Sequence, residues 1–120
     1  MKKFILIFFA LAIFAPISVN AQSAAANKAW APFLKQFRAA AVAKNRTAIL
    51  TMALDGSRFE TTAGGDTAAD LVQSNRHYKD ILSALNSGFT PWKGGKFTRK
   101  GCMWFKFIGN KWYWAGSPCD

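Results

Sequence analysis

The chain is poor in the residue types that build metal, redox and catalytic centres. Its 120 residues include 1 histidine and 2 cysteines, and the cysteines are not in the C-x-x-C spacing of redox and zinc motifs. No glycine-rich phosphate loop, serine elbow or cluster of metal ligands is present. The sequence therefore predicts no metal and no cofactor, and it makes an enzyme the less favoured class.

Long apolar runs are also lacking. The longest, Phe4 to Ala15, is shorter than the roughly 20 residues that a membrane-spanning helix needs. It follows Lys2 and Lys3 and precedes Pro16 and the small residues of Val19-Asn20-Ala21, a pattern typical of a signal peptide. A membrane anchor is the alternative, and no cysteine lies near the expected cleavage site to carry a lipid.

We expect residues 1–21 to be a cleaved signal peptide and residues 22–120 to form one domain. This domain would be periplasmic or secreted, and not transmembrane after cleavage. Export would place Cys102 and Cys119 in an oxidising compartment, where we expect them to form a disulfide. A redox-active or metal-binding pair is the alternative.

The first third of the expected domain has helical periodicity. Apolar residues recur on one face of the segment 23–45, at Trp30, Phe33, Leu34, Phe37 and Ala41. Because proline belongs in the first turn of a helix, Pro32 predicts a well-formed helix that starts near Ala31. Asn45 is expected to cap a second helix over residues 46–54.

Residues 56–65 are rich in glycine, serine and threonine and are expected to form a loop, with room for a short strand at 58–62. Asp66 or Thr67 would cap a third helix. Its apolar stripe runs from Leu71 to Leu85, and the helix would end at residues 86–88.

The C-terminal segment 102–119 alternates in a way that favours a β-hairpin. A two-residue turn at Gly109-Asn110 sets the register of its arms. The expected pairs are Phe107 with Trp112, Phe105 with Trp114, Ile108 with Lys111, Lys106 with Tyr113, and Trp104 with Ala115. The first two pairs, together with Met103, form an apolar face for the core, and the other three form a mixed face.

Upstream of this hairpin we expect a tight turn at residues 93–96, a strand from Phe97 and a bulge or break at Gly101. Without the break, Arg99 would share the core face with Met103. Helices first and an antiparallel sheet last is the order of an α+β domain. We therefore predict three N-terminal helices packed on a small curved antiparallel sheet that ends in a C-terminal hairpin.

Three segments resemble small exported bacterial proteins of the nuclear-transport-factor-like superfamily. They are Trp30-x-x-Phe33-x-x-x-Phe37-Arg38-Ala39-Ala40, Ala43-Lys44-Asn45-Arg46-Thr47-Ala48, and Gly109-Asn110-Lys111-Trp112-Tyr113-Trp114. The resemblance implies a cone-shaped fold in which helices pack into a curved antiparallel sheet. Ketosteroid-isomerase-like enzymes share that fold, and many exported members have no assigned activity.

One group of side chains suggests catalysis. His77 has Tyr78 beside it and Asp80 three positions on, so a histidine–aspartate pair could act as a general base and the tyrosine as a proton donor. In this hypothesis the protein is a ketosteroid-isomerase-like enzyme with an interior pocket. The alternative is a surface histidine beside a surface aspartate, because Tyr78 lies on the inward stripe and the other two do not.

A stronger signal is charge. The chain has 16 Lys and Arg against 6 Asp and Glu, and its formal net charge is +10 at pH 7. The candidate binding residues of the last third are Lys93, Lys96, Arg99, Lys100, Trp104, Lys106, Lys111 and Tyr113. On the mixed hairpin face, lysines and aromatic rings are interleaved, which favours binding to a polyanion.

For an exported protein the expected partner is an anionic envelope component, such as a lipid headgroup, a polysaccharide or an acidic protein. No specific nucleic acid is expected, since export separates the protein from cellular DNA and RNA and no recognition module is visible. Two alternatives remain. The lysines could only keep an aromatic-rich sheet soluble, with Trp104 covered. Or a small apolar ligand could bind between the helices and the hairpin.

Overall fold

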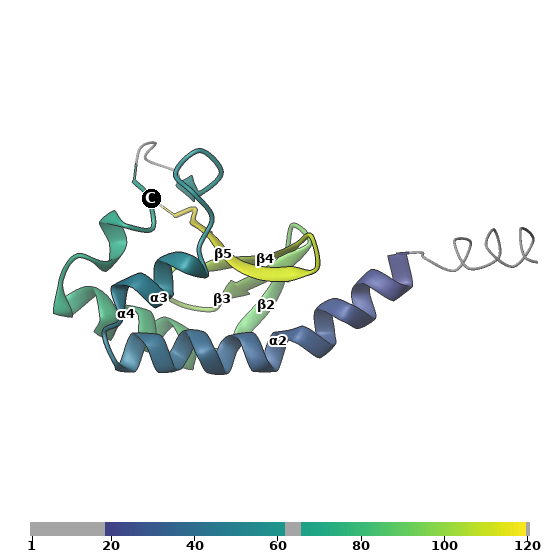
Figure 1. Ribbon diagram of the computed structural model, residues 1–120, viewed down its shortest axis with the longest axis horizontal. Helices are drawn as coiled ribbons and strands as arrows, with labels where there is room; N and C mark the ends of the chain where they lie inside the picture. Colours follow the sequence, from purple (N-terminus) through teal and green to yellow (C-terminus); the bar gives the residue numbers. More distant parts are fainter. Residues whose placement is uncertain (1–18, 62–65, 120) are drawn as a thin grey trace, which may run out of the picture.

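The computed structural model describes residues 19–61 and 66–119. Its elements are α2 (Val19–Val42), α3 (Arg46–Thr51), β1 (Glu60–Thr61), the 3₁₀ turn η1 (Asp70–Val72), α4 (Asn75–Asn86), β2 (Phe89–Trp92), β3 (Gly95–Thr98), β4 (Trp104–Ile108) and β5 (Lys111–Ser117). The helices pack against a five-stranded sheet with strand order β1-β5-β4-β3-β2 (Figure 1). The predicted α+β class is confirmed.

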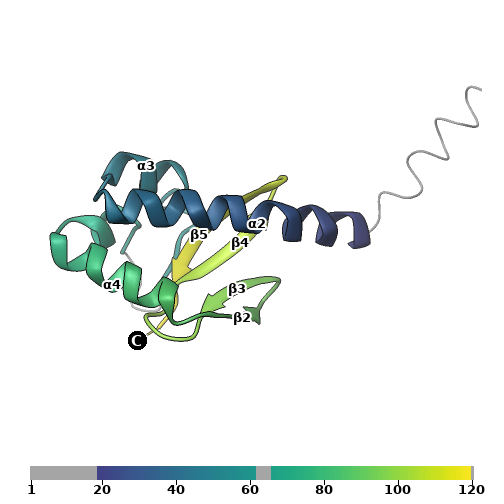
Figure 2. The ribbon, with the colours of Figure 1, turned by 90° about the horizontal axis from the view of Figure 1, so that it is seen from below.

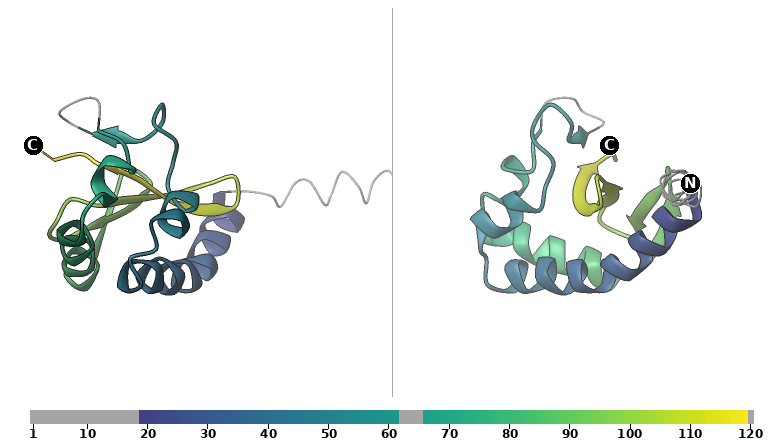
Figure 3. Two further views of the ribbon diagram at one scale, coloured as in Figure 1. Left: turned by 60° about the vertical axis from the view of Figure 1, so that its left-hand side comes forward. Right: turned by 45° about the vertical axis from the view of Figure 1, so that its right-hand side comes forward.

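The helices lie on one side of the sheet. Figure 2 and Figure 3 show α2 running along the sheet with α4 beside it, while the segment that carries β1 curls away on the other side. The predicted signal peptide lies mostly outside the described residues, because only its last three residues fall within α2. In the described part of the chain, no helix has the length and apolar content needed to cross a membrane.

The sheet is mixed, which corrects the prediction of a purely antiparallel one. The four strands β2 to β5 pair antiparallel, but β1 runs parallel to β5 with Glu60 beside Gly116. The chain reaches this position by running alongside β5 from Met52 onward, since the Trp114 N–H donates to the Met52 carbonyl at 2.8 Å and the Leu54 N–H donates to the Trp114 carbonyl at 3.0 Å.

Helix α2 is longer than predicted and passes through Pro32. A proline inside a helix removes one N–H donor and leaves the carbonyl four residues earlier without its partner. Here Pro32 and Lys28 are both exposed, so water can reach that carbonyl. The Trp112 indole Nε1 also donates to the Ala26 carbonyl at 2.8 Å and holds the N-terminal half of α2 against the sheet.

The predicted N-cap of the second helix is confirmed, because the Asn45 side chain accepts a hydrogen bond from the Ala48 N–H at 3.1 Å. Helix α3 ends at Thr51, three residues before the predicted end. The helix ends early because of a tertiary contact: the next residues form backbone hydrogen bonds with β5. The third helix is also shorter than predicted. Thr67 and Asp70 hold the separate turn η1, and α4 begins only after Ser74.

The hairpin register is confirmed for the four pairs nearest the turn, including Phe105 with Trp114 and Lys106 with Tyr113. The fifth pair was wrong: Trp104 lies opposite Gly116, with a bulge between Trp104 and Phe105. Gly116 is required there because a Cβ atom would overlap the Glu60 carbonyl. The predicted break at Gly101 is confirmed, with φ +82° and the Ala84 side chain close by.

The core between the helices and the sheet is aromatic. Phe37 and Phe105 are fully buried, and Trp114 is 2% exposed. The Phe37 ring meets those of Phe105 and Trp114 edge to face, with centroids 5.3 and 5.8 Å apart. Cys102 and Cys119 form the predicted disulfide, with Cα atoms 5.8 Å apart. It ties the loop before β4 to the residues after β5.

Candidate functional site: the outer face of the sheet

The face of the sheet turned away from α2 and α4, called the outer face here, has its own small apolar cluster. Leu54, Trp104 and Ala115 are buried in it. The partly buried members around them are Trp92, Phe97, Ile108 and Tyr113. Because none of the described helices covers this face, some ring surface stays accessible to a partner.

Three lysines lie directly beside these rings. The Lys93 Nζ is 4.6 Å from the ring centroid of Trp92, the Lys106 Nζ is 5.6 Å from that of Trp104, and the Lys111 Nζ is 6.0 Å from that of Tyr113. These distances are in the range of cation–π attraction, which stabilises the ammonium groups against the face. The interleaving of cations and rings predicted for the hairpin is therefore present.

Trp104 itself does not belong to the contact surface that the sequence predicted. Its side chain is only 4% exposed, and its Nε1 donates to the Trp92 carbonyl at 3.2 Å. Gly95 makes room for the indole, since a Cβ at that position would lie 2.8 Å from the Trp104 Nε1. Trp104 thus supports the face from beneath, and the more accessible rings are Trp92 and Tyr113.

Trp92 was missed by the sequence reasoning. The turn of the β2–β3 hairpin lies at Lys93-Gly94, where both residues have positive φ angles of 44° and 74°. This turn pairs Trp92 with Gly95, and the ring of Trp92 then lies 5.3 Å from that of Trp104. Placing a two-residue turn at Lys93-Gly94 would have put Trp92 on the outer face.

Five of the eight predicted site residues lie on the outer face, and the other three lie elsewhere. Trp104, Lys106, Lys111, Tyr113 and Lys93 come together on the outer face, as described above. Lys96 pairs with Phe105 on the helix side of the sheet, and its Nζ lies 5.3 Å from the Trp30 ring. Arg99 and Lys100 lie past the other end of β3, where their N–H groups donate to the Gly88 carbonyl at 2.9 Å and to the Ser87 hydroxyl at 3.0 Å.

Positive charge predominates in the last third of the chain, which supplies the three lysines of the outer face. Residues 81–119 contain no aspartate or glutamate, and their cations are Lys93, Lys96, Arg99, Lys100, Lys106 and Lys111. Within residues 19–61 and 66–119 the one ion pair joins Asp55 and Arg58, at 3.4 Å. The three lysines of the outer face therefore form no ion pair with another residue in this part of the chain.

A pocket of about 350 Å³ adjoins the lysines on the outer face. It lies between the segment 54–60 and strand β4, and its lining consists of Leu54, Ser57, Arg58, Phe59, Glu60, Trp104, Lys106 and Ile108. Lys106 belongs both to this pocket and to the lysine cluster. The volume is at the lower end of the range for ligand sites, roughly 300 to 1,000 Å³.

The loop beside this pocket is held by Asp55. Its carboxylate accepts hydrogen bonds from the Ser57 hydroxyl at 2.7 Å and from the Arg58 N–H at 3.2 Å. The Ser57 hydrogen bond, helped by the Arg58 guanidinium, holds the pKa of Asp55 below its ordinary value.

The Asp55 carboxylate stabilises the loop when it is ionised. Since its pKa is lower in the folded protein than in the unfolded chain, this stabilisation is present above the unfolded pKa and is lost as the pH falls through the folded pKa. We expect Ser57→Ala to raise the pKa of Asp55 toward its ordinary value, which a carboxyl NMR titration would measure. An unchanged titration would contradict this role of Ser57.

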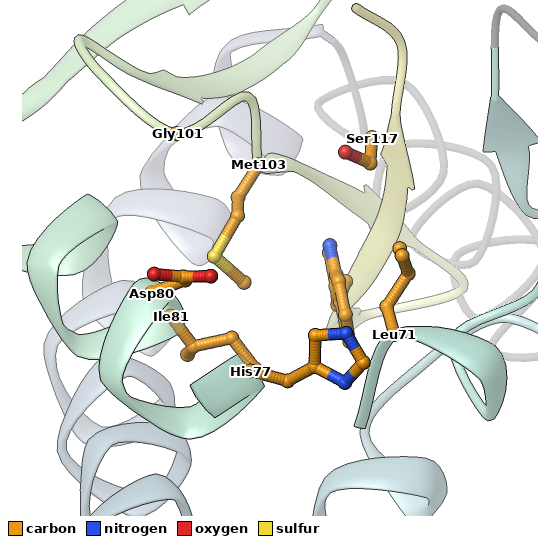
Figure 4. A pocket seen from close by; sticks show the side chains of 8 residues that line it. Leu71, His77, Asp80, Ile81, Gly101, Met103 and Ser117 are labelled. Carbon is orange, nitrogen blue, oxygen red and sulfur yellow. The ribbon is translucent and has the colours of Figure 1, made fainter. Parts of the chain in front are cut away.

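The histidine–aspartate pair of the enzyme hypothesis, the less favoured alternative, is not formed. His77 and Asp80 both line a second cavity, of about 130 Å³, between α4 and the loop before β4. In Figure 4 the imidazole of His77 turns toward Leu71, while the carboxylate of Asp80 lies on the side of Met103. No hydrogen bond joins the two side chains in the described part of the chain, and a cavity this small is below the usual range for ligand sites.

The individual groups already have structural partners. The His77 Nδ1 accepts the Ser74 N–H at 3.3 Å and so caps α4. The Tyr78 hydroxyl is buried and donates to the Val72 carbonyl at 3.0 Å, so it is not placed to donate a proton to a substrate. Trp30 itself is packed against the hairpin, since its ring lies 5.6 Å from that of Phe105 and 4.8 Å from that of Trp112.

Three features thus define the candidate site: an uncovered sheet face, three lysines above aromatic rings, and an adjoining pocket. Together they bring positive charge, ring surface and a cavity to one place on the sheet. A comparison of the chain with protein-family models, with curated proteins and with solved structures finds no match.

Proposed function

We propose that the protein is an exported, non-catalytic binding or accessory protein of the bacterial cell envelope and that it binds an anionic partner through the outer face. The observation that carries the proposal is the placement of Lys93, Lys106 and Lys111 above rings of one uncovered sheet face. Lysines that only kept the sheet soluble would not need to gather over rings.

Export is supported by the covalent link. A disulfide between Cys102 and Cys119 persists in an oxidising compartment, so it is consistent with a periplasmic or secreted protein. The expected signal peptide points the same way. Membership of the nuclear-transport-factor-like superfamily stays a proposal too, supported by helices that pack on one face of a sheet. The close packing of the Trp30 ring against Phe105 and Trp112 argues against a small apolar ligand or a ketosteroid-isomerase-like active site at that place.

Binding of this kind depends on salt. Exposed charges interact over a Debye length of about 10 Å at 0.1 M ionic strength and about 3 Å at 1 M. We therefore expect the protein to be retained on a sulfonate resin and on phosphatidylglycerol vesicles at low salt and to be released as salt increases. Retention that did not change with salt would contradict an electrostatic site.

Charge-reversal variants test whether affinity depends on the outer face or only on the net charge of the protein. The variant Lys106→Glu/Lys111→Glu changes the net charge by the same amount as Lys28→Glu/Lys35→Glu on the exposed side of α2. We expect the first variant to lower affinity for an anionic polymer about tenfold or more, and the second only about twofold, because the first pair lies within the face. Affinity would be measured by titration at 50 mM salt, with circular dichroism as the folding control. Equal losses would mean that only net charge matters and would overturn the proposal.

A further inference from the structure

The pocket beside the lysines contains a carboxylate. Glu60 lines it together with Lys106 and Arg58, so groups of both signs face the same space. Glu60 is exposed and makes no ion pair among the described residues. A partner that carried only negative charge would be repelled by Glu60. A partner that also carries hydroxyl groups would donate hydrogen bonds to it.

The other walls of the pocket fit the body of a sugar. Ile108, Leu54 and Trp104 give an apolar lining. The Ser57 hydroxyl, which donates its proton to Asp55, can accept a hydrogen bond from the sugar. Saccharide rings have apolar C–H surfaces and a rim of hydroxyl groups, so they need both kinds of lining. Beyond Lys106, the half-buried rings of Trp92 and Tyr113 extend the apolar surface along the face.

We propose that the anionic partner is an acidic polysaccharide. One sugar unit occupies the pocket, where Glu60 accepts hydrogen bonds from its hydroxyl groups. The neighbouring acidic units lie along the outer face, where Lys106, Lys111 and Lys93 bind their carboxylate, phosphate or sulfate groups. This inference rests on the proposed function, since it names the partner of the same face.

A lipid surface fits less well. Proteins that lie on bilayers insert protruding apolar side chains into the headgroup region. The one large apolar side chain found exposed in the described part of the chain is Val42, at the end of α2 on the other side of the sheet. An acidic protein segment fits less well too, because its acidic side chains bring no donor to Glu60 and only its backbone N–H groups could bond to this carboxylate.

The test compares two probes with the same number of carboxylates, a hexamer of galacturonic acid and a hexapeptide of glutamic acid whose N-terminus is acetylated and whose C-terminus is amidated. We expect the full protein to bind the sugar at least about tenfold more tightly, measured by calorimetry at 50 mM salt. Phosphatidylglycerol vesicles and a neutral maltohexaose serve as the lipid and uncharged-sugar controls.

The variant Glu60→Ala is expected to change the affinity for the two probes in opposite directions. If the carboxylate accepts hydrogen bonds from a sugar, its removal should weaken binding of the galacturonate hexamer about five- to tenfold. It should strengthen binding of the glutamate peptide about twofold, because one repulsive charge is lost. Asp80→Ala on α4 removes a charge of the same sign away from the pocket and should not weaken binding of either probe.

The possible outcomes distinguish a failure of the polysaccharide inference from a failure of the proposed anion-binding function. If both probes bind equally and Glu60→Ala strengthens both, the partner is a simple polyanion; the sugar inference is overturned and the proposed function stands. Stronger binding to the vesicles than to the sugar also overturns the inference, in favour of a lipid surface. If neither polymer nor vesicle binds, or if Lys106→Glu/Lys111→Glu has no effect, the proposed function itself fails. Thermal unfolding of each variant shows that it is folded.

Discussion

Replacing Trp114 with alanine is expected to lower the free energy of unfolding by about 3–5 kcal/mol, the usual cost of truncating a buried aromatic residue. Trp114 is 2% exposed and lies at the centre of the main core. Its ring meets that of Phe59 at 5.1 Å and that of Phe37 at 5.8 Å, both edge to face. The indole Nε1 also donates to the Gly116 carbonyl at 3.0 Å, next to the β1–β5 pairing.

This loss is a large part of the total, since domains of this size are stable by about 5–15 kcal/mol. Urea denaturation followed by circular dichroism would measure it. The matched control is Trp92→Ala on the outer face, where the half-buried ring has fewer neighbours and a loss of about 1–2 kcal/mol is expected. Trp114→Phe keeps most of the ring and should fall between the two. Equal losses for the two alanine variants would contradict the placement of the core between helices and sheet.

Removal of the disulfide is expected to cost about 3 kcal/mol, as calculated for a closed loop of this size. Cys102 and Cys119 are 17 residues apart and enclose the whole β4–β5 hairpin. In the chain-entropy model, the cross-link restricts the unfolded chain and leaves the folded hairpin almost unchanged. The variant Cys102→Ser/Cys119→Ser should therefore keep the fold at low temperature but unfold at lower urea concentration.

Reduction of the unmodified protein provides the control for this prediction. Its urea midpoint after treatment with dithiothreitol should match that of the double serine variant, and the serine variant should not respond to the reductant. If the oxidised protein and the double variant unfolded at the same urea concentration, the link would have no role in stability.

The hairpin shows which part of the strand pairing can be predicted from the sequence. Side chains on a strand alternate with period two, and a two-residue turn leaves only one register for its arms. Placing the turn at Gly109-Asn110 therefore predicted Phe107 opposite Trp112 and Phe105 opposite Trp114. The prediction failed at Trp104, because the bulge there depends on Gly116, and Gly116 is constrained by the close approach of Glu60 from a distant part of the chain.

The helix ends also differ in whether local or distant residues determine them. The cap at Asn45 was predicted because its hydrogen bond to the Ala48 N–H is local. The end of α3 was not, since Met52 and Leu54 leave the helix to bond with Trp114, which is about half the chain away. Pro32 suggested a helix start on local grounds, but the packing of Trp30 and the hydrogen bond of Trp112 keep α2 helical on both sides of it.

For the candidate site, the local pattern was enough to predict which lysines and rings of the hairpin share a face and their order along each strand, because period and turn chemistry are local properties. Three facts depend on long-range packing instead: Trp104 is buried, Glu60 shares a pocket with Lys106, and three of the predicted cations lie away from the face, namely Lys96, Arg99 and Lys100. Those facts follow from the parallel passage of the segment 52–61 along β5 and from the side of the sheet that the helices cover. Contacts between residues so far apart along the chain leave no periodic pattern in the sequence.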